Sequence, residues 1–295
     1  MQAQLNRRWK GDTYGSRWMH KSLTSMLRVV DVRLVYAFAA LFVVPFTLKR
    51  PGAFIVYRYF RKRIGYGKLH SLWATYENHC MFAQVVIDRF AMYAGKHFTL
   101  HIQDYEHFAR LVEKPECFLQ LSAHVGNYEL SGYSLNSEAK PISALVFAGE
   151  KSTVMSSRRR MFGPNKVTMI PIMPDMSHLY AVNNALSAGE IVSFPADRVF
   201  GSEKTVDVNF LGGLVSLPAG PFRMAVMRGC EVLAINAMKT GLRKYDIYVS
   251  SLNWDRGAKR NSQVKELASA YASQLEEIVR LYPTQWYNYF EFWEQ

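Results

Sequence analysis

The chain has 295 residues, of which 49% are hydrophobic and 20% are charged, so it can bury a core and is not a disordered chain. Its net charge of +12 lies at one end, because residues 1–70 contain 14 Lys and Arg and two acids, whereas the remainder is neutral overall. A nucleic-acid-binding protein more often spreads its basic residues around a groove, so nucleic acid is not the expected partner.

Residues 34–48, LVYAFAALFVVPFTL, form an uncharged apolar run with basic residues on both sides. A helix of this length spans about 22 Å, which is short for a hydrocarbon core about 30 Å thick. We therefore expect a membrane-anchoring helix that is monotopic or re-entrant; a short tilted span and a buried core helix are the alternatives. The basic residues around it favour an anionic membrane surface. Residues 1–70 are thus expected to be a basic region that carries the anchor.

The three cysteines, Cys80, Cys117 and Cys230, are far apart in the sequence and form no CxxC pair. This pattern argues against a zinc ribbon, an iron–sulfur cluster and a disulfide scaffold, and it indicates a reducing compartment.

Beyond the anchor, the sequence predicts one α/β domain over residues 71–295, with a central mixed sheet flanked by helices. Apolar residues at helical spacing predict a helix over 71–94. Short apolar runs then alternate with helical stretches. The predicted strands are 117–123, 143–148, 167–172, 190–196, 231–238 and 245–252, and the predicted helices are 175–188, 218–228 and 262–282. The last strand alternates apolar and polar residues, which is typical of an edge strand.

The segment HVGNYE, residues 124–129, follows the first predicted strand of this alternating pattern. Reactive groups collect at the carboxyl ends of strands in open α/β sheets. A histidine held by a carboxylate is a general-base arrangement, so His124 and Glu129 are the candidate catalytic pair. Backbone N–H groups of the strand-to-helix turn are candidates to stabilise an oxyanion. The plain alternative is a satisfied polar pair, and the spacing does not suit zinc.

This segment resembles the His-x4-Asp/Glu signature of the lysophospholipid acyltransferase superfamily, and most closely the signature of the bacterial lipid A biosynthesis (late) acyltransferases. SFPADRVFG at 193–201 is similar to the second strand-end block of that superfamily, and LPAGPFRMAVMRGCEVLAI at 217–235 to its small-residue helix and strand. The ending YPTQWYNYFEFW is similar to the Pro-x-Gln-Trp tail of these enzymes.

The resemblance implies that His124 and Glu129 are catalytic. It also implies substrate-binding roles for Asn127, Asp197, Arg198 and one or more of Arg158, Arg159 and Arg160, although each arginine is equally well explained as a solvated residue. No cofactor or metal is expected, and the chain has no G-x-S-x-G elbow, P-loop or GxGxxG motif.

The expected activity is transfer of a fatty acyl chain from an acyl-carrier-protein or CoA thioester to a hydroxyl or amine of a membrane lipid such as a lipid A precursor. Basic residues 58–68 can dock the acidic carrier protein or face lipid headgroups. The expected location is the cytoplasmic face of the inner membrane. The alternatives are an amino-acid lipid or lysophospholipid acceptor, a lipid hydrolase, and a non-catalytic lipid-binding protein.

Overall fold

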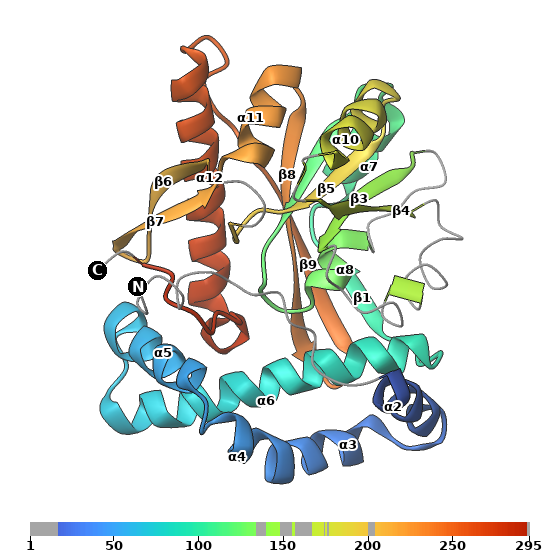
Figure 1. Cartoon of the computed structure of the whole chain (residues 1–295), viewed down its shortest axis with the longest axis vertical. Helices are drawn as coiled ribbons and strands as arrows, with labels where there is room; N and C mark the ends of the chain where they lie inside the picture. The colour runs from blue at the N-terminus through green and yellow to red at the C-terminus, as the bar shows by residue number, and fades with distance from the viewer. Residues whose placement is uncertain are drawn as a thin grey trace.

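In the computed structural model of the protein, seven strands form one mixed sheet in the order β1-β9-β8-β2-β5-β3-β4 (Figure 1). The residues described are 17–133, 140–147, 155–156, 167–173, 175, 177–199 and 204–293. The strands of the sheet are β1 (Thr99–Ile102), β2 (Phe118–Ser122), β3 (Ile142–Phe147), β4 (Val167–Ile172), β5 (Ile191–Pro195), β8 (Glu231–Gly241) and β9 (Lys244–Ser251). A separate antiparallel hairpin consists of β6 (Thr205–Phe210) and β7 (Gly213–Pro218).

The pairing confirms the predicted mixed α/β sheet. Neighbouring strands from β8 through β2, β5 and β3 to β4 are parallel, whereas β9 runs antiparallel to β8. The prediction that residues 245–252 form an edge strand is wrong, because the short strand β1 pairs with β9 from Thr99↔Lys244 to Ile102↔Ile247. Strand β9 therefore lies inside the sheet, and its alternating pattern reflects the two different layers that cover it.

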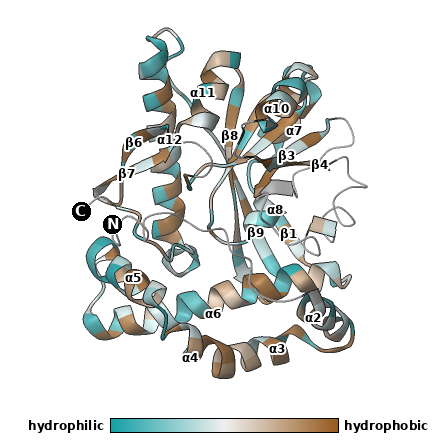
Figure 2. Cartoon of the chain, viewed as in Figure 1, coloured by the Kyte–Doolittle hydropathy of each residue, from teal (hydrophilic) through white to brown (hydrophobic). Residues whose placement is uncertain are grey.

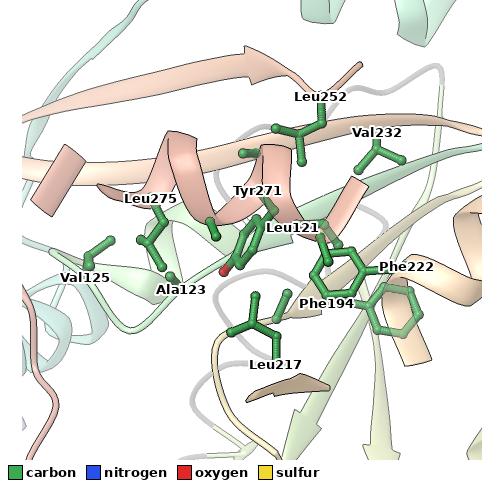
Figure 3. Close-up of a cluster of buried hydrophobic side chains, with 14 of the residues drawn as sticks. Leu121, Ala123, Val125, Phe194, Leu217, Phe222, Val232, Leu252, Tyr271 and Leu275 are labelled. Carbon is green, nitrogen blue, oxygen red and sulfur yellow. The ribbon is translucent and has the colours of Figure 1, made fainter. Parts of the chain in front are cut away.

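Helices cover both faces of the sheet, and alternate residues of a strand enter different cores, as the period of two requires. On one face, Leu121 of β2 and Val232 of β8 pack with Phe222 and Tyr271 (Figure 3). On the other face, Phe118 and Leu233 pack with Phe108. The helices behind these cores are α7 (Tyr105–Glu113), α8 (Tyr128–Tyr133), α10 (His178–Ser187), α11 (Ala219–Arg228) and α12 (Arg260–Leu281).

Helix α6 (Lys68–Tyr93) lies across the end of the sheet to which β8 points, and α3 (Val32–Phe38), the π-helical turn η1 (Ala39–Val43) and α4 (Val44–Thr47) run along its far side (Figure 1). Helix α2 (Arg17–Val29) precedes them in the chain. Helix α5 (Pro51–Tyr59) and the π-helical turn η2 (Phe60–Ile64) follow, and most of their buried residues join the core that contains Phe210 and Trp286. Residues of α2 and α3, among them Leu27, Val32 and Val35, form a third core with Ile87 and Phe90 of α6. The chain after α12 passes through a short 3-10 turn, η4 (Pro283–Gln285), and returns along the same end of the sheet.

The apolar run 34–48 is helical but broken, since it extends over α3, η1 and α4. Within the described part of the chain, no single helix has both the length and the apolar character needed to cross a bilayer. The bent pair Val32–Thr47 and Pro51–Ile64 meets that requirement only when its two arms, 100° apart, are taken together.

Candidate active site

The strand-to-helix turn after β2 is fixed by backbone contacts on two sides. Gly126 has a left-handed φ of +50°, and a Cβ at this position would lie 2.1 Å from the carbonyl oxygen of Ala237 on β8. The Gly126 N–H donates to the Gln285 carbonyl at 2.8 Å, and the Asn127 N–H donates to the Ala237 carbonyl at 2.7 Å. Only glycine fits such a close approach. Both N–H groups therefore have backbone acceptors, so neither of these two is available to an oxyanion.

His124 lies against a carboxylate from the next strand of the sheet. Its Nδ1 is 2.8 Å from Asp197 Oδ1, and its backbone N–H donates to Asp197 Oδ2 at 2.9 Å. Asp197 follows β5, which pairs in parallel with β2, so the two strand ends meet. The His124 side chain is 16% exposed and that of Asp197 is 3% exposed. The buried Asp197 carboxylate contacts the backbone N–H and the ring Nδ1 of His124, and these two contacts fix the orientation of the His124 ring.

The electrostatics of this pair determine which ring nitrogen carries the proton. Burial acts to raise the pKa of Asp197, but the charge and hydrogen bonds of His124 and the nearby Arg198 outweigh burial, and the pKa lies below its ordinary value. Asp197 is therefore an ionised acceptor at neutral pH. In the neutral imidazole we assign the proton to Nδ1, where it is donated to Asp197, and this assignment places the lone pair on Nε2.

Glu129 is buried in the first turn of α8 and is held by α6. Arg89 Nη1 donates to Glu129 Oε1 at 3.0 Å, and the Tyr93 hydroxyl donates to Oε2 at 2.7 Å. Arg89 and Tyr93 are four residues apart on one face of α6, which directs both side chains to the same carboxylate. Tyr128 lies between the two halves of the site, with its ring 5.1 Å from the His124 ring and its hydroxyl 3.4 Å from Arg89 Nη1.

A sequence profile of the bacterial lipid A biosynthesis acyltransferases matches residues 81–293, a segment that contains His124, Glu129 and Asp197. The chain belongs to this family. It is therefore an acyltransferase, as its sequence predicts. No curated protein matches the sequence.

Among solved structures, the acyltransferase resembles the crystal structure of the 1-acyl-sn-glycerophosphate (LPA) acyltransferase PlsC from Thermotoga maritima. The sequence identity is 13% and the TM-score 0.39, over 92% of this chain and 100% of that chain.

Two residues assigned to substrate binding have contacts inside the acyltransferase. The Asn127 side chain is 2% exposed, and its Oδ1 accepts from the Leu130 N–H at 3.3 Å, which caps α8. Arg198 Nη2 donates to the Tyr287 carbonyl at 2.8 Å, and its guanidinium lies 5.6 Å from the Phe290 ring. Burial lowers the pKa of Arg198, and Asp197 opposes this shift. Arg158, Arg159 and Arg160 lie outside the described residues.

The C-terminal segment supplies contacts that the sequence analysis did not assign. The Tyr287 N–H donates to the His124 carbonyl at 3.0 Å, so Tyr287 links His124 to Arg198 through its two backbone groups. Trp286 forms a backbone bridge with Val125. The Gln285 side chain donates to the Lys239 carbonyl at 2.8 Å and accepts from the Lys239 N–H at 2.9 Å. The Gln-Trp pair of the tail motif was the sequence feature that could have indicated these contacts. The sequence did not indicate that this pair lies against the turn after β2.

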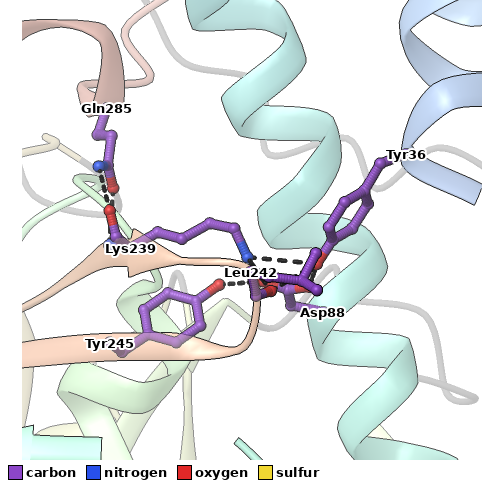
Figure 4. A network of polar contacts seen from close by, with 6 residues as sticks. All are labelled: Tyr36, Asp88, Lys239, Leu242, Tyr245 and Gln285. Atoms are coloured by element: carbon purple, nitrogen blue, oxygen red, sulfur yellow. Dashed lines mark hydrogen bonds and ion pairs between the residues drawn. The ribbon is translucent and has the colours of Figure 1, made fainter. Parts of the chain in front are cut away.

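A buried ionic cluster holds α6 on the sheet beside Glu129 (Figure 4). Lys239 Nζ of β8 lies 2.6 Å from Asp88 Oδ2, and the hydroxyls of Tyr36 and Tyr245 donate to the same carboxylate. Asp88 is fully buried, and burial raises its pKa against the opposing effect of Lys239. Because Asp88 precedes Arg89, this cluster fixes the helical turn that holds Glu129.

Proposed function

We propose that this acyltransferase moves a fatty acyl chain from the thioester of an acyl carrier protein to a hydroxyl of a membrane glycolipid such as a lipid A precursor. The observation that supports it best is the 2.8 Å contact between His124 Nδ1 and Asp197 Oδ1. This contact prepares Nε2 of His124 to accept a proton, which is what attack of a hydroxyl on a thioester requires.

In this mechanism the Nε2 atom of His124 removes the proton of the acceptor hydroxyl as its oxygen attacks the thioester carbonyl carbon. The ionised Asp197 stabilises the imidazolium that forms. The tetrahedral intermediate collapses with cleavage of the carbon–sulfur bond, and the imidazolium returns the proton to the departing thiolate. The products are the acylated lipid and the free carrier thiol, and no covalent acyl-enzyme is formed.

The role that we propose for Glu129 is that of a positioning residue. From the sequence alone, Glu129 is expected to orient His124, whereas we assign the contact at His124 Nδ1 to Asp197. Glu129 shares its two carboxylate oxygens between Arg89 and Tyr93. We propose that the buried ion pair of Glu129 and Arg89 positions the first turn of α8 and the Arg89 guanidinium beside the reacting groups.

The exposed face of α3, η1 and α4 is the proposed membrane surface. Leu34, Phe38, Phe42 and Phe46 follow one another at intervals of four residues, and all are more than half exposed (Figure 2 shows this hydrophobic run). An exposed apolar stripe rimmed by polar residues is typical of a surface that contacts a protein or a membrane. Exposed basic residues flank this stripe in the sequence: Arg28, Arg33, Lys49 and Arg50.

This surface lies close to the reacting groups, because a single helix, α6, separates α3 and α4 from the sheet (Figure 1). Tyr36 of α3 and Glu129 contact consecutive residues of α6, Asp88 and Arg89. We propose that α3 and α4 enter the headgroup region at the cytoplasmic face of the inner membrane as a monotopic anchor, so that a lipid acceptor reaches His124 without leaving the membrane surface.

Three arginines of the basic segment 58–68 have partners inside the protein. Arg58 pairs with Glu291 at 2.9 Å, Arg61 donates to the Tyr66 carbonyl, and Arg63 donates to the Gly212 carbonyl at 3.0 Å. The exposed cations Lys62 and Lys68 are therefore the better candidates to attract the acidic carrier protein. A Lys62→Glu/Lys68→Glu variant is expected to lose kcat/KM for the carrier-bound donor most strongly at low salt.

The deciding test is a transfer assay with labelled acyl carrier protein and a total lipid extract. Wild type is expected to form a labelled lipid, which mass analysis identifies, and His124→Ala to lose it. Label released only as free fatty acid would identify a hydrolase. Unchanged lipid binding without turnover, in wild type and in His124→Ala alike, would indicate a non-catalytic lipid-binding protein.

A further inference from the structure

Two cysteines that are 113 residues apart in the sequence meet at the amino-terminal end of the sheet. The Sγ atoms of Cys117 and Cys230 are 3.0 Å apart, and both residues are free thiols. Cys117 directly precedes β2, Cys230 directly precedes β8, and the two parallel strands pair from Phe118↔Glu231 onward. The two cysteines are far apart in the sequence, which argued against a disulfide scaffold, but the register of β2 and β8 brings this one pair together.

The backbone at this position suits a covalent bond between the two sulfurs. Neighbouring strands lie about 4.8 Å apart, which falls within the range of Cα separations that disulfides span. A disulfide bond is about 2.0 Å long, so the sulfur atoms have to approach each other by about 1 Å. Small rotations about the Cα–Cβ bonds can close such a gap while the β2–β8 pairing is kept.

We propose that Cys117 and Cys230 form a redox site, in which a hydroperoxide converts the dithiol reversibly to a disulfide. The Cys117 thiolate attacks one peroxide oxygen and the O–O bond breaks, which gives a sulfenic acid on Cys117. The other oxygen takes up a proton from solvent and leaves as water or an alcohol. The Cys230 thiol then attacks the Cys117 sulfur, and the hydroxyl departs as water. Two thiols lose two electrons in total, and one peroxide gains them. A thiol reductant restores both side chains by exchange.

The surroundings of the two sulfurs assign these roles. Cys117 is half-buried, so its sulfur is the more accessible of the two and meets the peroxide first. Cys230 is 4% exposed, and burial together with the contact to Cys117 raises the pKa of its thiol. Cys230 therefore stays protonated and acts second, on the sulfur that already faces it.

The position of Cys117 and Cys230 in the sheet predicts that oxidation raises the thermal stability of the protein. Strand β2 begins next to Cys117 and leads to His124 at its other end, so the two sites are separated by the length of the strand. A disulfide here joins β2 to β8 and closes a loop of more than 100 residues, which restricts the unfolded chain strongly. We expect the oxidised protein to melt about 5 °C higher than the reduced one.

The test uses the full-length protein treated with hydrogen peroxide, followed by thiol alkylation and peptide mapping under non-reducing conditions. We expect alkylatable thiols to fall from three to one, a single Cys117–Cys230 crosslink within one chain, and recovery of three thiols with dithiothreitol. Cys80 on α6 provides the matched control, because Cys80→Ser is expected to leave both the crosslink and the rise in melting temperature unchanged.

Cys117→Ser and Cys230→Ser are each expected to abolish the crosslink and the rise in melting temperature. Cys117→Ser should also prevent sulfenic acid labelling, whereas Cys230→Ser should trap it. Three alkylatable thiols after oxidation of the folded wild type, or crosslinks that involve Cys80 or a second chain, would overturn the proposal. Melting curves of the reduced variants establish that each one is folded before it is compared.

Discussion

Asp197 contacts both nitrogens that His124 presents to it, the ring Nδ1 at 2.8 Å and the backbone N–H at 2.9 Å. One carboxylate thus fixes the main chain and the ring of the same residue. Because Asp197 belongs to the end of β5 and His124 to the end of β2, the pairing of two parallel strands sets their separation. The ring orientation is therefore a property of the sheet rather than of the loop.

Replacing Asp197 by Asn is expected to lower kcat by about 10²–10⁴-fold with a smaller change in KM, because the amide does not stabilise the imidazolium and can select the wrong tautomer. Glu129→Gln, measured beside it, separates the two carboxylates. Equal pH profiles for wild type and Asp197→Asn, together with an altered profile for Glu129→Gln, would return the orienting role to Glu129.

The depressed pKa of Asp197 also predicts how stability depends on pH. His124 and Arg198 hold that pKa below its ordinary value of 3.8 despite the opposing effect of burial. Such a group contributes stability that is fully present above pH 3.8 and is lost as the pH falls through the lower, folded-state pKa. The difference in unfolding free energy between wild type and Asp197→Asn should therefore shrink as the pH falls below about 4. Chemical denaturation between pH 3 and 6 measures it, and a constant difference would contradict the assignment.

Much of the fold could be predicted because its strands are apolar runs bounded by clear turn signals. The predicted strand 167–172 coincides with β4, and the predicted helix 175–188 corresponds to α10, which starts three residues later, at His178, and ends at Ser187, two residues before Gly189 with its φ of +77°. The short strand β1 was missed because it is only four residues long, and three of them are exposed, so the pattern is too short to indicate a strand. The β6–β7 hairpin was missed because its turn depends on positive φ angles at Leu211 and Gly212, of which the first is unusual for leucine.

The active site was predicted in its parts but not in its pairing. Sequence placed His124 and Asp197 at two strand ends, yet strand order decides which ends are neighbours, and that order depends on the whole sheet. Arg89 and Tyr93 were assigned to an amphipathic helix, and only the packing of α6 across the end of the sheet brings them to Glu129. The spacing of residues along the chain does not indicate strand order or how α6 packs on the sheet.

Gly126→Ala tests the close approach at the catalytic turn. The added Cβ would lie 2.1 Å from the Ala237 carbonyl and would occupy a left-handed conformation, so we expect loss of about 3 kcal/mol or more of unfolding free energy and loss of transfer activity. Gly65→Ala is the matched control, since Gly65 has a φ of +88° but no atom within 4 Å of the added Cβ. It should cost about 1 kcal/mol, the cost of the backbone conformation alone. Equal losses in urea denaturation would contradict the steric argument.

The buried pair of Asp88 and Lys239 should be costly to break from either side. Asp88→Asn and Lys239→Met each leave one buried polar partner without its counterion, and we expect each to lower the unfolding free energy by about 3–5 kcal/mol. The double variant should cost less than the sum of the two, because no uncompensated charge remains. Urea denaturation of all four proteins gives the coupling energy, and strict additivity would show that the two groups do not act as a pair.

The proposed membrane surface predicts a loss of lipid binding that depends on position. Leu41→Glu and Phe42→Glu place charges in the exposed apolar run of η1, and we expect each to weaken binding to anionic vesicles about tenfold or more, since burying one such side chain is worth about 1.5–3 kcal/mol. Met227→Glu is the matched control, because Met227 is 70% exposed on α11, apart from that run. Vesicle co-flotation at two salt concentrations separates the apolar contribution from that of the basic residues. If Met227→Glu weakened binding as much as Phe42→Glu did, the membrane would not contact α3 and α4 preferentially.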